Sequence, residues 1–111
     1  MGNFLKLTAL EEAIMLAILD IPRYGQNIVE VVSDASDGNY QIDPGTLYPA
    51  LHRLGSRGLI KEKKVQVGND CRSLKIRRGH NRRYYQVTPD GREILEEIER
   101  IRFQIRSQQT T

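Results

Sequence analysis

The residues best suited to binding chemistry lie between Asp43 and Gly58, a segment with the apolar period of a short helix. The side opposite its leucines mixes small residues, an aromatic ring, hydroxyls and cations. No acidic residue follows Asp43 within the segment. Hydroxyl and guanidinium donors without a repelling carboxylate suit the phosphates and base edges of a nucleic-acid groove. The predicted contact residues are Thr46, Tyr48, His52 and Arg53.

Arg53 is the best candidate for a base contact, because its forked guanidinium matches O6 and N7 of guanine. The boundaries of the helix are also predicted: Asp43 caps it, Pro44 suits its first position and Gly58 ends it. Pro49 lies inside and predicts a bend. An ordinary amphipathic helix whose outer side happens to lack acids would give the same pattern, so both interpretations stay open.

A second cationic region covers residues 61–83, which hold nine lysines and arginines against two acidic residues. The chain as a whole carries a net charge of +3, so the remaining residues are net acidic. A field polarised in this way is typical of a protein with a polyanionic partner. A solvated basic loop without a partner is the alternative. The residues predicted to hold a nucleic-acid backbone are Lys64, Arg77, Arg78 and Arg82.

Length and composition predict one globular domain of 111 residues. The longest apolar run, residues 13–19, is too short to span a membrane, and no export leader opens the sequence. Cys71 is the single cysteine, which suits a reducing compartment. We therefore expect a cytoplasmic protein.

The first predicted helix starts at the capping box Thr8–Glu11 and runs to about Leu19. Its second half is apolar on more than one side, which favours contacts with both its own core and a second subunit. We therefore predict Ile14 and Ile18 as dimerisation residues; a merely central helix is the alternative. A second helix is expected from Tyr24 to about Ser36.

The second half of the sequence predicts two strands and a long helix. The strands cover residues 59–67 and 82–87, and the basic loop between them would make the hairpin a wing. Thr88 and Pro89 then open the last helix. Isoleucines at spacings of four, three and four form a short heptad seam, predicted to pair two subunits. Its members are Ile94, Ile98, Ile101 and Ile105.

The predicted fold is mainly α with a small β-hairpin: a winged helix-turn-helix plus a C-terminal dimerisation helix. The division is residues 1–87 for the winged domain and 88–111 for the helix and its frayed tail. Two such helices in a dimer would place the 44–57 segments in successive major grooves of double-stranded DNA, about 34 Å apart.

Several blocks of the sequence together carry a family resemblance: residues 7–14 and 22–25, Pro44-Gly45-Thr46-Leu47-Tyr48-Pro49-Ala50-Leu51, Arg53-Leu54, Arg57-Gly58-Leu59-Ile60, and Arg83-Tyr84-Tyr85 with Thr88 and Gly91. In the right order and over nearly the whole chain, they resemble the PadR-like transcriptional regulators. The resemblance implies a bacterial homodimeric DNA-binding repressor, with a possible small-molecule effector between the first and last helices. Gly55 stands where the family usually has an acidic residue, and the stretch between Ile60 and Tyr84 is several residues longer than usual. The bacterial DNA-binding protein that the resemblance implies would be associated with the nucleoid.

Two other functions remain open at this point. A winged-helix module can bind a protein instead of DNA, and a metal-responsive regulator would need soft ligands. Cys71, His80 and His52 are the available ones, but their spacing matches no standard metal site. No nucleophile motif accompanies the histidines, so we expect neither an enzyme nor a cofactor.

Overall fold

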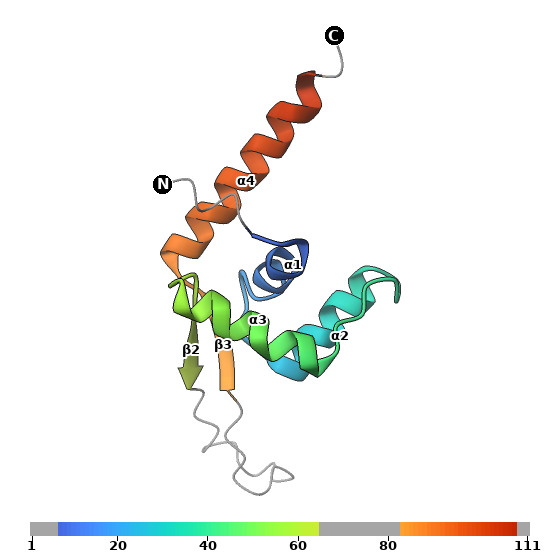
Figure 1. The fold of residues 1–111 in the computed structure, drawn as a ribbon, viewed down its shortest axis with the longest axis vertical. Helices are drawn as coiled ribbons and strands as arrows, with labels where there is room; N and C mark the ends of the chain where they lie inside the picture. The colour runs from blue at the N-terminus through green and yellow to red at the C-terminus, as the bar shows by residue number, and fades with distance from the viewer. Residues whose placement is uncertain (1–6, 65–82, 109–111) are drawn as a thin grey trace, which may run out of the picture.

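The structure is a computed structural model that describes residues 7–64 and 83–108. It is mainly helical with one small sheet, as the sequence predicts (Figure 1). In chain order the elements are α1 (Ala9–Ala17), β1 (Arg23–Tyr24), α2 (Gly25–Ala35), α3 (Pro44–Ser56), β2 (Ile60–Lys64), β3 (Arg83–Val87) and α4 (Pro89–Ser107).

Helices α1, α3 and α4 begin where their capping signals place them. The Thr8 hydroxyl accepts from the Glu11 N–H, and the Glu11 carboxylate accepts from the Thr8 N–H, both at 3.0 Å. Asp43 caps α3 and Thr88 caps α4 through their side chains. Gly58 has φ +76°, and the N–H that follows it donates to the carbonyl of Leu54 at 3.0 Å. The left-handed glycine thereby ends the turn after α3, as predicted.

The sheet has three strands in the order β1-β3-β2, all antiparallel. Strands β2 and β3 form the predicted hairpin, with Ile60 opposite Val87. The short β1 was not predicted: the sequence suggested a helix from Tyr24, whereas Tyr24 pairs with Tyr84 and the helix begins one residue later. Arg23 holds this corner, because its Nε donates to the Ala17 carbonyl at 2.8 Å.

Helix α1 lies at the centre of the protein, packed between α2 and α3. Ile14 and Ile18 are almost completely buried in the core of their own chain. Their side chains are therefore not available to a partner subunit, contrary to the prediction. The apolar residue that α1 does expose is Leu16. The sequence showed that α1 is apolar on two sides but not which side meets the core.

Helix α4 divides into a packed half and a projecting half. Leu95 and Ile98 are 5% and 7% exposed, and Ile94 packs against the core. Beyond them the helix leaves the rest of the protein (Figure 1), and Phe103 and Ile105 are 66% and 57% exposed. The isoleucine seam is thus not uniformly exposed to solvent. Ile94 and Ile98 pack largely within their own chain, whereas Ile105 is exposed.

The joint between the sheet and α4 is tightly packed. The Thr88 N–H donates to the Leu59 carbonyl at 3.0 Å, and the Thr88 hydroxyl donates to the Gly58 carbonyl at 2.7 Å. Gly91, in the first turn of α4, lies so close that a Cβ there would overlap the Leu59 carbonyl oxygen. Only glycine fits this position without moving backbone.

Gly91→Ala and Gly55→Ala test this packing as a matched pair. Gly91→Ala should destabilise by about 2 kcal/mol or more, because the methyl group meets a fixed carbonyl. Gly55→Ala meets nothing within 4 Å and should stabilise α3 by up to about 1 kcal/mol. Urea denaturation of both variants measures the free energies of unfolding. Equal effects of the two substitutions would contradict the close approach at Gly91.

Candidate nucleic-acid interface

Helix α3 separates cleanly into a buried and an exposed side. Four apolar side chains face the core: Leu47, Ala50, Leu51 and Leu54. The exposed side contains Thr46, Tyr48, His52, Arg53 and Ser56, and no acidic residue occurs in the helix. The structure therefore presents all four predicted α3 residues at the surface, on a side that offers donors and cations without a carboxylate of its own.

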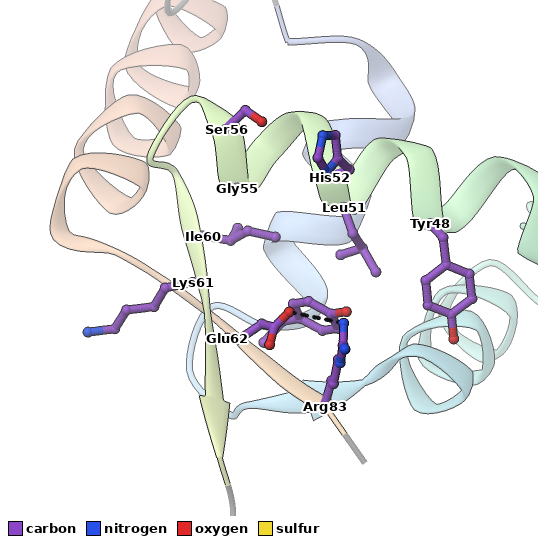
Figure 2. A pocket seen from close by; sticks show the side chains of 10 residues that line it. Tyr48, Leu51, His52, Gly55, Ser56, Ile60, Lys61, Glu62 and Arg83 are labelled. Carbon is purple, nitrogen blue, oxygen red and sulfur yellow. Dashed lines mark ion pairs between the residues drawn. The ribbon is translucent and has the colours of Figure 1, made fainter. Parts of the chain in front are cut away.

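A groove of about 440 Å³ lies between the exposed side of α3 and strands β2 and β3 (Figure 2). Tyr48 and His52 line it from the helix, and Lys61 and Arg83 line it from the sheet. The fold thus brings the two α3 side chains beside cations at the base of the wing. A groove with donors on both walls can hold a sugar–phosphate strand.

Among the described residues, the acidic side chain that lines this groove is Glu62. Its carboxylate pairs with the Arg83 guanidinium, the closest N···O distance being 3.5 Å (Figure 2). Both side chains are largely exposed, so the pair contributes little to stability and can exchange partners at low cost. Arg83 is therefore held over the groove but can turn to a phosphate.

Gly25 is a site residue that the sequence analysis missed. It starts α2, and a Cβ at this position would overlap the Tyr48 hydroxyl. Tyr48 therefore lies against the start of α2, beside a smaller cavity of about 230 Å³ that Tyr24, Arg83 and Tyr85 also line. Burial, and then the Glu62 carboxylate, raise the pKa of Tyr85, so this phenol stays protonated.

Arg53 has a partner that the sequence did not reveal. Its Nε donates to Oε2 of Glu11 at 3.0 Å, across a sequence separation of 42 residues. The Arg53 side chain is nevertheless 51% exposed. The guanidinium is thus anchored at one edge and reaches the surface, while its predicted contact with guanine stays a prediction.

Glu11 is buried, with 4% of its side chain exposed, yet it is charged. Burial alone would raise its pKa. The Thr8 N–H and the Arg53 guanidinium, with a further contribution from Arg57 at 3.8 Å, outweigh burial and hold the pKa below the usual 4.5. The carboxylate is therefore ionised at neutral pH and links the first turn of α1 to α3.

The residues predicted to hold a nucleic-acid backbone lie at the end of β2 or outside the described residues. Lys64 is the last residue of β2. Arg77, Arg78 and Arg82 lie outside the described residues, as do Cys71, His80 and the valines of the predicted strand end. Within residues 7–64 and 83–108 no group of three His, Cys, Asp or Glu side chains could hold a metal ion. Across the same ranges, no helix has the length and apolar character needed to cross a membrane.

A third hollow in the surface bears on the predicted effector site. It measures about 310 Å³ and lies between α1 and α2, with Leu16 and Tyr40 among its mostly apolar lining residues. The prediction placed an effector between the first and last helices. Those helices are joined by an ion pair within the chain, in which the two terminal nitrogens of Arg102 donate to the Glu12 carboxylate oxygens at 2.8 and 3.1 Å.

Replacing Glu11 by Gln should make stability less dependent on pH. Because the folded pKa is lowered, the charged Glu11 stabilises the fold above pH about 4.5, and this contribution is lost as pH falls through the folded pKa. At neutral pH, Glu11→Gln should lower the free energy of unfolding by about 1–3 kcal/mol. Urea titrations between about pH 7 and 3 measure the difference, which should shrink toward acid. Exposed Glu30→Gln is the control, and a constant difference would contradict the assignment.

Comparisons with known proteins place the chain in a family. The model of the transcriptional regulator PadR-like family matches residues 14–97. Transcriptional regulator Rv3488 of Mycobacterium tuberculosis is 37% identical over 70 residues, which are 63% of this chain and 56% of that protein. The match thus spans little more than half of that relative's length.

Solved structures show the same fold. A PadR-like transcription factor from Bacteroides fragilis matches with a TM-score of 0.71 and 28% identity, over 89% of this chain and 84% of that one. Bacillus subtilis PadR, solved in complex with operator DNA, matches with a TM-score of 0.65 and 18% identity, over 82% of this chain and 46% of that one. With its family model matched over most of its length, the chain belongs to the PadR-like family of transcriptional regulators.

Proposed function

We propose that the protein regulates transcription by binding double-stranded DNA with α3 in the major groove. The observation that carries the proposal is the exposed side of α3, which combines Thr46, Tyr48, His52 and Arg53 with no acidic residue. An α-helix fits the major groove, where side-chain donors can read base edges. The structure of Bacillus subtilis PadR with operator DNA supports the same role for this chain.

The wing supplies the second half of the proposed interface. Lys61, Lys63 and Arg83 are exposed on β2 and β3, next to the groove that α3 lines. Lys64 and the arginines at 77, 78 and 82 continue the same basic segment. Phosphate contacts fix register and orientation without reading sequence, so the wing would position α3 while α3 selects the site.

A homodimer would give this interface its symmetry. Phe103 and Ile105 lie on the projecting half of α4 and expose apolar surface that the described part of their own chain leaves uncovered. A second copy of α4 is the occupant we propose, with Ile101 beside the same surface. Two copies would then present two α3 helices to half-sites about 34 Å apart. Action as a repressor, with release by a small effector, completes the proposal.

In-vitro selection of duplex DNA with the purified protein should recover an inverted repeat. Replacing Arg77 and Arg78 together by Ala should weaken binding to all DNA alike and flatten the salt slope by about one to two units, because two phosphate contacts are lost. His52→Ala should instead reduce discrimination between the selected and a shuffled site. Gel shifts at several salt concentrations measure both effects.

The control for the wing variant is Arg106→Ala, which removes an exposed cation near the far end of α4. Binding that is weak, independent of salt and indifferent to sequence would contradict DNA regulation and favour a protein-binding module.

The double variant Phe103→Glu with Ile105→Glu should be monomeric, because charges would be buried where two helices meet. Light scattering after gel filtration measures the mass, and circular dichroism checks the fold. Gln104→Glu is the matched control, since it adds the same charge to an exposed position between the two. A double variant that keeps the mass of the unaltered protein would exclude this surface from the dimer.

A further inference from the structure

Glu11 is the one charged side chain that is buried among the described residues. It lies in the first turn of α1, yet its strongest side-chain partner is Arg53, on the exposed side of α3. A buried carboxylate is costly unless it is paired, so its presence at this point calls for a reason beyond helix capping.

The two carboxylate oxygens of Glu11 have different partners. Oε1 accepts from the Thr8 N–H at 3.0 Å and lies 3.8 Å from Arg57 Nη1. Oε2 accepts from Arg53 Nε at 3.0 Å. The Thr8 contact fixes the position of the carboxylate, and the carboxylate in turn fixes the Nε edge of the guanidinium. The Glu11 contact uses Nε of Arg53 and not its two terminal nitrogens, and the side chain that carries them is half exposed.

We propose that Glu11 is a positioning residue for DNA recognition, which holds Arg53 in the orientation that reads a base. This inference rests on the proposed function. An arginine has many rotamers, and ordering it on binding costs entropy. The Glu11 contact orders Arg53 before DNA arrives, so the guanidinium fork meets the base edge already aligned.

Charge separates this role from simple support of the fold. Glu11 partly neutralises Arg53 and Arg57, so in a purely electrostatic sense it opposes binding to phosphates. Loss of the negative charge should therefore leave affinity for unrelated DNA unchanged or higher. Discrimination should nevertheless fall, because the orientation of Arg53 is no longer imposed. A residue that only supported the fold would lower both affinities together.

Glu11→Gln is the appropriate change, because glutamine keeps the size of the side chain and can still complete the capping box. Because Thr8 and Arg53 donate to different oxygens of Glu11, the single carbonyl oxygen of glutamine can occupy only one of the two positions, and its amide group would face the other donor. Arg53→Ala and the double variant complete a cycle. Glu30→Gln, on the exposed side of α2, is the control for lost negative charge.

Affinity is measured by fluorescence anisotropy for two duplexes: one selected in vitro by the unaltered protein, and one of the same composition with its sequence shuffled. Glu11→Gln should lower the ratio of the two affinities by roughly tenfold, the size expected for one bidentate base contact. In the Arg53→Ala background the same substitution should leave the ratio unchanged, because Glu11 acts through Arg53.

An undiminished ratio in Glu11→Gln overturns the inference while the proposed function stands. An equal loss in the Arg53→Ala background also overturns it. Should the unaltered protein select no site at all, the proposed function fails and this inference fails with it. If Glu11→Gln does not unfold cooperatively, Glu11→Asp replaces it: the charge remains, the reach to Arg53 is shorter, and the same loss of discrimination is expected.

Discussion

The buried carboxylate of Glu11 sets the relation between the centre of the protein and its exposed recognition surface. Because an unpaired charge in that position would be strongly unfavourable, α1 and α3 must approach so that Thr8, Arg53 and Arg57 surround it. The apolar side of α3 packs the same two helices together. One polar contact and one apolar contact thus hold α3 at a defined rotation about its own axis.

That rotation decides what α3 shows to solvent. With its leucines turned inward, α3 contributes Tyr48, His52 and Ser56 to one wall of a groove whose other wall is the sheet. The interface is therefore assembled from segments far apart in the sequence. Within it, the Glu62 carboxylate is paired with the neighbouring Arg83 guanidinium. A polyanion in this groove would meet donor groups of Tyr48 and His52 on the helix wall and the cations Lys61 and Arg83 on the sheet wall.

Local features of this fold and the pairing of β2 with β3 could be predicted from the sequence, whereas features without a sequence pattern could not. The Thr8, Asp43 and Thr88 caps act within one turn, so their residue types alone indicate where helices begin. Strand β1 has two residues, too few for an alternating pattern. The Glu11–Arg53 contact joins residues 42 apart, and spacing carries no signal for it. Likewise, the apolar character of α1 indicated burial without showing that Ile14 faces its own core.

The packing at Gly91 limits how far the direction of α4 can change relative to the rest of its subunit. Helix α4 has 19 residues, about 28 Å, and starts from a joint with no room for a side chain. A tilt of one degree at that joint would move the far end by about 0.5 Å over this length. In the proposed dimer the tightly packed start of α4 therefore fixes the direction of the helix. Adaptation to operators with altered half-site separation would have to come from substitutions along α4, not at its start.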